Sequence, residues 1–387
     1  MNHKKPDIDF SWFQNHLDEI IINRFDPVIT SHGLFMPCFD RKWNHIQNKY
    51  STLLSQARLL YVFSTAYRLY GDETYLCAVE RGIEFLFSKF RDNRYGGLFH
   101  GVDPDGNILD DRKSGYAHTF VIFGLVHAWA ITGDPRHKER ALEMVQFIRS
   151  HFMDKAGGLY FFMSRDFKPE TDFKSQNPTM HYFEALLKTY EETRQKNIFS
   201  EVERVADFVL KKLVRQPDVI LPEIYDNHWQ EHPEGRIDLG HQLEWAFLLS
   251  RAVGLGFPGR YLDYGYAFIR NAIAIGYDPV HGGLNSPATP QKTLFKERKN
   301  WWEQCELVRC LLHYTVKRGL KGYEAPLEKS IDFIKNEMID PVYGGWFTTL
   351  EAGNDLHKQY KSCSGKEHYH IIGMCLEALS CRDVLNS

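Results

Sequence analysis

The chain repeats one short stretch of sequence, Tyr95-Gly96-Gly97-Leu98-Phe99. Further copies are Gly157-Gly158-Leu159-Tyr160-Phe161, His281-Gly282-Gly283-Leu284 and Tyr343-Gly344-Gly345-Trp346-Phe347. Gly96 and Gly157 are 61 residues apart, and Gly282 and Gly344 are 62 apart. The 125 residues between Gly157 and Gly282 hold a degenerate copy near Leu221, and His32-Gly33-Leu34-Phe35 lies one period before Gly96. A fixed period of this length is typical of a repeat architecture, here with six units.

Each unit is expected to contain a short hairpin followed by two helices. Glycine pairs supply the backbone freedom of tight turns, and a short apolar run follows each pair. Leu53, Leu60 and Tyr67 recur at helical spacing, and residues 74–90 form a second helical pattern. Six units of hairpin, inner helix and outer helix predict an all-α fold, a closed (α/α)6 barrel. An open solenoid is the alternative, but it would need capping repeats.

Composition narrows the class of protein. The chain has 387 residues, 43% of them hydrophobic, and a formal net charge of -3. It lacks the basic excess of a nucleic-acid binder, a secretory leader and an apolar stretch long enough to cross a membrane. Its seven cysteines include no CxxC pair, which favours reduced thiols and a cytoplasmic location. No linker divides the chain, so residues 1–387 are expected to form one domain, as a monomer or homodimer.

Unusual polar residues follow every copy of the repeat by roughly 20 to 26 residues, where the inner helix begins. Since equivalent helix starts share one mouth of the barrel, these side chains are expected to converge there. They are Arg58, Tyr116 with His118, Asn177 with His181, His241 with Glu244, Trp301 and Trp302 with Glu306, and His368 with His370.

These residues do not all favour a functional role. A single histidine on an apolar helix is more often structural, which is the interpretation preferred for His118 and His368. Arg58 is flanked by apolar residues and is costly to bury unpaired, so Glu306 or Glu244 is expected as its partner. Adjacent Trp301 and Trp302 face different ways, so one should pack and one should face the pocket.

Motifs for metals and cofactors are missing. The sequence has no HExxH and no cysteine–histidine cluster with ligand spacing, and His368 and His370 are two residues apart on a helix, a poor chelate. It also lacks GxGxxG and P-loop motifs. We therefore expect neither a metal nor a cofactor.

The short motifs at the helix starts carry a resemblance to a known family. They are Gln56-Ala57-Arg58, Gly115-Tyr116-Ala117-His118, Asn177-Pro178-Thr179-Met180-His181, Gly240-His241-Gln242-Leu243-Glu244-Trp245, Trp301-Trp302-Glu303-Gln304-Cys305-Glu306 and Tyr369-His370. In this order they resemble the N-acylglucosamine 2-epimerase superfamily, which includes mannose and cellobiose 2-epimerases and aldose–ketose isomerases. Gly373 departs from the pattern, because many of the epimerases carry an arginine there.

The resemblance implies a cofactor-free (α/α)6 barrel acting on a sugar. It implies that His241 and His370 are catalytic, that Arg58 and His181 hold sugar oxygens with Glu306 beside them, and that Tyr116 and Trp302 belong to the pocket. We add Asn177 and Glu244 as substrate-binding candidates from their positions. Histidine suits this chemistry because it takes and returns protons near neutrality, and arginine can stabilise an enediolate.

The expected reaction is the interconversion of free D-mannose and D-glucose by proton exchange at C2. The alternative is isomerisation of D-mannose to D-fructose, in which the proton returns to C1. Less favoured are a cellobiose-type 2-epimerase, a glycoside hydrolase using two of Glu244, Glu306 and Glu367, and a helical-repeat scaffold without activity.

Overall fold

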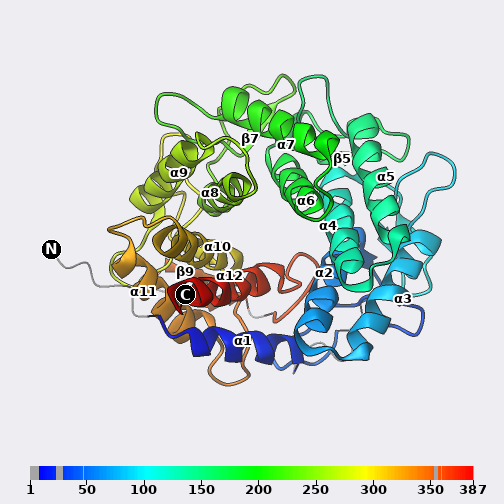
Figure 1. Ribbon diagram of the computed structural model, residues 1–387, viewed down its shortest axis with the longest axis horizontal. Helices are drawn as coiled ribbons and strands as arrows, with labels where there is room; N and C mark the ends of the chain where they lie inside the picture. Colours follow the sequence, from blue (N-terminus) through cyan, green and yellow to red (C-terminus); the bar gives the residue numbers. More distant parts are fainter. Residues whose placement is uncertain (1–7, 23–28, 47, 353–355, 359, 387) are drawn as a thin grey trace.

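Helices in two concentric rings dominate the computed structural model, which describes residues 8–22, 29–46, 48–352, 356–358 and 360–386 (Figure 1). The inner ring contains α2 (Leu53–Tyr70), α4 (Gly115–Thr132), α6 (Asn177–Thr193), α8 (Leu239–Gly254), α10 (Trp301–Leu312) and α12 (Tyr369–Asn386). The outer ring contains α1 (Phe10–Ile22), α3 (Glu73–Lys89), α5 (Pro135–His151), α7 (Lys196–Phe208), α9 (Tyr261–Gly276) and α11 (Glu324–Phe333). Short π-helical segments extend α7, α10 and α11 over Val209–Leu213, His313–Lys317 and Ile334–Met338. The predicted (α/α)6 barrel is confirmed.

The two ends of the chain close the ring. The last inner helix, α12, packs against α1, so the outer helix of the sixth unit comes from the N-terminal segment (Figure 1). Trp346 Nε1 donates a hydrogen bond to His16 Nε2 at 2.7 Å, and a backbone bridge joins Phe39 to Ser362. A closed barrel of this kind buries both ends of what would otherwise be an open solenoid.

A small backbone bridge marks the hairpin of every unit, including the degenerate copy near Leu221. These bridges join Ile29 to Phe35, Arg91 to Leu98, Met153 to Leu159, Arg215 to Ile220, Tyr277 to Leu284 and Ile339 to Trp346.

A polar side chain on the inner helix holds most of these hairpins. His118 Nε2 accepts from the Leu98 amide at 3.0 Å, and Gln304 Oε1 accepts from the Leu284 amide at 2.8 Å. Gln56, Thr179 and Gln242 make the corresponding bonds in their units. Buried amides require such partners, so His118 has the structural role expected for it.

Short antiparallel strands link neighbouring units next to the starts of the inner helices. The sheets are β1 (Ser51–Thr52) with β2 (Gly101–Val102) and β3 (Ile108–Asp110); β4 (Lys113–Ser114) with β5 (Phe162–Met163); β6 (Phe173–Ser175) with β7 (Ile224–Asp226); and β8 (Arg298–Asn300) with β9 (Thr349–Glu351) and β10 (Leu356–Lys358). Bridges at Ile237–Ala288 and Phe39–Ser362 join the remaining neighbours. This collar holds the N-terminal ends of the inner helices at one mouth.

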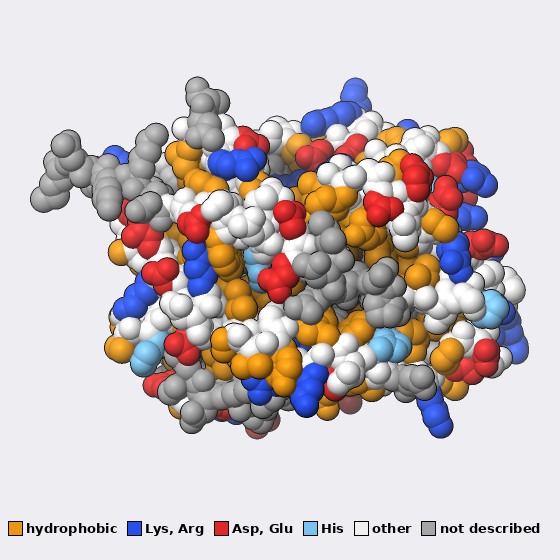
Figure 2. Space-filling view, turned by 90° about the horizontal axis from the view of Figure 1, so that it is seen from below, with side chains coloured by type: hydrophobic (Ala, Val, Ile, Leu, Met, Phe, Trp, Pro, Cys, Tyr) orange, Lys and Arg blue, Asp and Glu red, His pale blue; other side chains and the backbone are white. Residues whose placement is uncertain are grey.

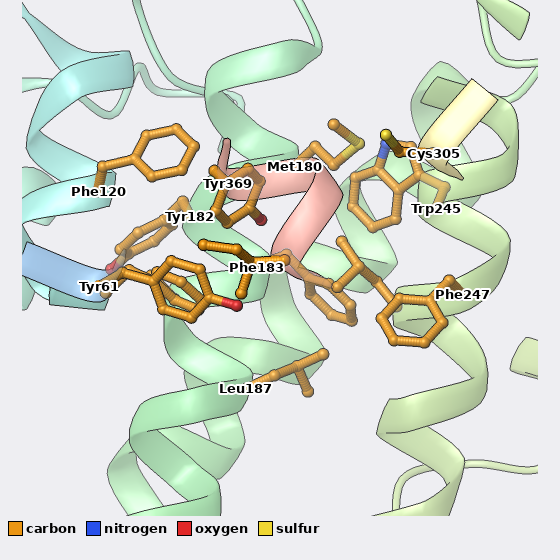
Figure 3. Close-up of a cluster of buried hydrophobic side chains, with 14 of the residues drawn as sticks. Tyr61, Phe120, Met180, Tyr182, Phe183, Leu187, Trp245, Phe247, Cys305 and Tyr369 are labelled. Atoms are coloured by element: carbon orange, nitrogen blue, oxygen red, sulfur yellow. The ribbon is translucent and has the colours of Figure 1, made fainter. Parts of the chain in front are cut away.

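Aromatic side chains fill much of the barrel wall. Tyr182, Phe183 and Trp245 lie fully buried among the inner helices (Figure 3). On the face seen in Figure 2, acidic and basic side chains are interspersed, without a broad patch of one sign. In the described part of the chain, every helix is too short or too polar to cross a membrane.

Candidate active site

Two of the predicted histidines meet over one tryptophan. His241 lies in the first turn of α8, His370 in the first turn of α12, and Trp302 in the first turn of α10, between them in the ring. The ring centroid of Trp302 is 4.9 Å from that of His241 and 5.5 Å from that of His370. Trp301 is 4% exposed and its ring centroid also lies 5.5 Å from that of His370, so both tryptophans contact this histidine, and Trp302 is the less buried of the two.

A carboxylate from the preceding loop orients His241. Its Nδ1 lies 2.8 Å from Glu223 Oε2, and Glu223 also accepts hydrogen bonds from Ser175 Oγ at 2.6 Å and Gln176 Nε2 at 2.8 Å. Burial disfavours a charged imidazole, but Asp238 and Glu223 outweigh it and raise the pKa of His241 to about 10. His241 is therefore an imidazolium at neutral pH. Its Nδ1–H is held by Glu223, which leaves Nε2 as the reactive nitrogen.

His370 is held in a similar way but has the opposite charge preference. Its Nδ1 lies 2.8 Å from Glu306 Oε1, and Arg309 contacts the same oxygen at 3.3 Å. Burial, followed by the nearby charge of Arg58, lowers the pKa of His370 well below the usual value. One imidazole is thus charged and the other neutral, which is the pairing of a general acid with a general base.

His181 is also paired with a carboxylate through Nδ1. Its Nδ1 lies 3.0 Å from Glu184 Oε2, and Tyr369 donates its hydroxyl proton to the other oxygen of this carboxylate. The edge of its ring meets Tyr116, at 5.2 Å between centroids. Burial lowers the pKa of His181, so its ring is neutral.

Arg58 lies beside these histidines, but its partners differ from those expected. Its guanidinium donates to the Tyr116 hydroxyl at 2.8 Å and to the Gly365 carbonyl at 3.1 Å, and it lies 3.5 Å from Glu367 Oε2. The expectation of Glu306 or Glu244 was wrong. The reason is the order of the ring: the loop before α12 lies next to α2, whereas α8 and α10 are not neighbours of α2 (Figure 1).

Two further candidates carry oxygens that lack a hydrogen-bond partner. Both carboxylate oxygens of Glu244 are buried and have no partner among the described residues, and the same holds for the side-chain oxygen of Asn177. Burial, reinforced by the charge of Glu306, raises the pKa of Glu244 well above its usual value, so its acid is neutral and able to donate a proton. Unsatisfied buried oxygens are costly unless a ligand or water completes them.

The same helices form two clusters of metal-ligand type. His181, Glu184 and Glu244 form one, and Glu244, Glu306 and His370 form the other, each with ligand atoms within 4.8 Å of one another. These clusters join residues from different helices, so spacing along the sequence does not reveal them. Arg58 and Arg309 supply positive charge here already, which opposes the binding of a divalent cation.

The orienting role of the carboxylates Glu184, Glu223 and Glu306 was not predicted from the sequence. Glu184 is three residues after His181, and Arg309 is three after Glu306, so helical spacing alone could have paired them. Glu223 lies in the degenerate copy of the repeat, which was interpreted only as a hairpin. Its pairing with His241 depends on the tertiary fold.

Comparison with known proteins shows the family of the chain. A family model described as N-acylglucosamine 2-epimerase matches residues 33–374. The chain belongs to the N-acylglucosamine 2-epimerase family. As a member it is an isomerase of carbohydrates, either a 2-epimerase or an aldose–ketose isomerase.

Relatives within the family have both kinds of name. A cellobiose 2-epimerase of Bacteroides fragilis is 28% identical over 341 residues, covering 84% of this chain and 86% of the relative. A D-mannose isomerase of Marinomonas mediterranea is 26% identical over 388 residues, covering 95% and 96%. A crystal structure of a D-mannose isomerase matches the fold with a TM-score of 0.90 at 24% identity, covering 97% of this chain and all of the other.

Proposed function

We propose that this member of the N-acylglucosamine 2-epimerase family interconverts free D-mannose and D-glucose. One observation carries the proposal: His241 and His370 lie on one indole, each anchored through Nδ1 by its own carboxylate, with opposite protonation at neutral pH. Inversion at C2 needs one group to remove a proton and another to return one from the opposite side.

His370, Arg58 and His241 each have one role in the proposed reaction. In the open-chain aldose, neutral His370 takes the C2 proton through Nε2, which gives a cis-enediolate. Arg58, which cannot lose its own proton, stabilises the developing oxyanion. The His241 imidazolium then protonates C2 on the other face. The reverse reaction starts with the two protonation states exchanged.

A second candidate is the isomerisation of D-mannose to D-fructose, favoured by the nearly full-length match to the isomerase of Marinomonas mediterranea. It uses the same enediolate. The difference is that the proton is delivered to C1, so one base on one face suffices.

Incubation with D-mannose in D2O, followed by NMR, distinguishes the two. Epimerisation yields glucose with deuterium at C2, whereas isomerisation yields fructose with deuterium at C1. We expect His241→Asn and His370→Asn each to lower kcat at least about a hundredfold, as loss of a general acid or base does, and the exposed His228→Asn to have no effect. Wild-type turnover in either active-site variant would refute the proposal.

A parallel incubation with cellobiose tests the less favoured alternatives. Released glucose would indicate a hydrolase, and an epimerised disaccharide would indicate a cellobiose-type enzyme. Two of the three carboxylates expected for hydrolysis are engaged elsewhere, Glu306 with His370 and Glu367 with Ser55, each at 2.8 Å, which leaves Glu244 without a second free carboxylate. We expect neither product to match the rate on mannose.

A further inference from the structure

A cavity lies toward the end of the barrel where the inner helices finish. Its volume is about 340 Å³. All six inner helices or their extensions contribute to its lining, among them Arg68 of α2, His127 of α4, Lys188 of α6 and Arg251 of α8. The histidines of the active site lie in the first turns of the inner helices, whereas the cavity is lined mainly by their later turns, so the two sites are separated along the barrel axis.

Positive charge predominates in this basal cavity. Its lining contains the cations Arg68, Lys188, Arg251, Arg309 and Lys317, but only two acids, Glu191 and Glu377. Lys188 and Arg251 share Glu191, at 3.0 and 3.2 Å, and Lys188 also pairs with Glu192 at 2.5 Å. Arg309 pairs with Glu306 at 3.3 Å and Lys317 with Glu377 at 2.7 Å. Arg68 forms no ion pair with any described residue. Cations near helix C-terminal ends are favourable in themselves, which accounts for part of this charge but not for its concentration around a cavity.

Two buried polar groups on the cavity wall lack acceptors. His127 is 9% exposed and makes ring contacts with Tyr61 and Phe123, at 4.7 and 4.6 Å, but forms no hydrogen bond with the described residues. Arg309 Nε is buried without a partner. Tyr61 and Phe247 stand on opposite sides of this region, from α2 and α8 (Figure 3). The cavity thus combines a few aromatic and apolar side chains with charged groups and unsatisfied donors, as ligand sites do.

We propose that the basal cavity binds a phosphate group, either inorganic phosphate or a phosphate monoester. Guanidinium groups bind phosphate oxygens in pairs and lysines bind them as point charges, which matches the arginines and lysine here. The proposal is independent of the reaction proposed above, because it uses neither His241 nor His370.

Arg309 joins the two sites. Its Nη1 contacts Glu306 of the active site at 3.3 Å, while its side chain also lines the basal cavity. The Glu306 carboxylate in turn holds His370. Only two side chains, Arg309 and Glu306, would therefore separate a phosphate bound at Arg309 from the imidazole of His370.

Isothermal titration of the full chain with inorganic phosphate tests the proposal, with chloride adjusted to constant ionic strength. We expect one saturable site that remains in the presence of saturating mannose. A second titration, with glycerol phosphate, shows by its relative affinity whether a free ion or an ester fits better. Heats that do not saturate, or competition by mannose, would overturn the proposal.

Variants locate the binding. Lys188→Gln and Arg251→Gln should each weaken phosphate binding about tenfold, the loss of one charge-assisted contact. Arg68→Gln changes an exposed position that folding tolerates, and it should also weaken phosphate binding. Lys89→Gln removes an exposed cation from the last turn of α3, outside the cavity, and should leave the affinity unchanged. Equal affinities in all four variants would contradict the assignment.

Discussion

Arg309 lies directly against Gly373. A Cβ atom built on this glycine would be 3.1 Å from the guanidinium carbon of Arg309. The missing side chain on α12 thus leaves room for a guanidinium from α10, at the position where many epimerases carry an arginine of their own. Arg309 uses this room to reach Glu306, so the glycine indirectly shapes the surroundings of His370.

Gly373→Ala should therefore lower kcat without lowering stability. The new methyl group pushes the guanidinium away from Glu306, and we expect a loss of about three- to tenfold. Alanine is favoured over glycine in a helix by up to about 1 kcal/mol, so the free energy of unfolding should stay level or rise. Steady-state kinetics and urea denaturation measure the two effects.

The control is Gly254→Ala in α8, where an added Cβ meets only Arg318 at 3.8 Å. Activity should be unchanged in this variant. An equal fall of kcat in both variants would mean that Arg309 is not the cause.

Glu223→Gln should shift the alkaline limb of the pH–rate profile. In the wild type, Asp238 and Glu223 outweigh burial and raise the pKa of His241 to about 10, so the acid form persists well above neutrality. Removing the charge of Glu223 lowers this pKa, and activity should be lost at a lower pH. Glu231→Gln, in the same loop but paired with Arg215, should leave the limb in place. If the alkaline limb of the Glu223→Gln profile stayed at the wild-type pH, Glu223 would not contribute to the pKa that controls this limb.

Lys361→Met should destabilise the fold. Lys361 and Asp340 form a fully buried ion pair at 2.9 Å, one of four aspartate–lysine pairs that recur with the repeat, beside Asp92–Lys113, Asp154–Lys174 and Asp278–Lys299. Breaking a buried pair leaves a charge in the interior and costs about 3–5 kcal/mol.

Urea denaturation of this variant gives the free energy of unfolding. The matched control is Lys211→Met, which removes an exposed lysine paired with Asp207. This control should change the free energy of unfolding by less than about 1 kcal/mol. If Lys361→Met lowered the free energy of unfolding no more than the control does, the prediction would be wrong. The remaining ion pair between Asp340 and Arg41 would then compensate fully for the loss of Lys361.

Exhaustive treatment with a chelator should leave activity unchanged. The clusters around Glu244 have ligand geometry, but Arg58 and Arg309 already supply positive charge there. Activity should be measured before and after dialysis against EDTA, with the metal content checked by mass spectrometry. Loss of turnover that zinc or manganese restores would assign a metal to these residues.

Much of the site was predictable because it follows the period of the repeat. His241, His370, Trp302 and Arg58 occupy equivalent positions near the starts of inner helices, and equivalent positions in a closed ring share one mouth. Glu223 was not predicted, since it lies 18 residues before His241, with strand β7 and a loop between them. The partner of Arg58 was predicted incorrectly, because sequence spacing does not reveal which helices are neighbours once the ring closes.

The sequence by itself determined the six-unit barrel and the kinds of side chain at its catalytic mouth, because a period near 62 residues and helical spacing are local properties of the chain. Only the tertiary structure decided which carboxylate holds which histidine, and hence that His241 is charged while His370 is neutral. The physical reason is that protonation depends on burial and on charges a few ångströms away, and these come from residues distant in the chain.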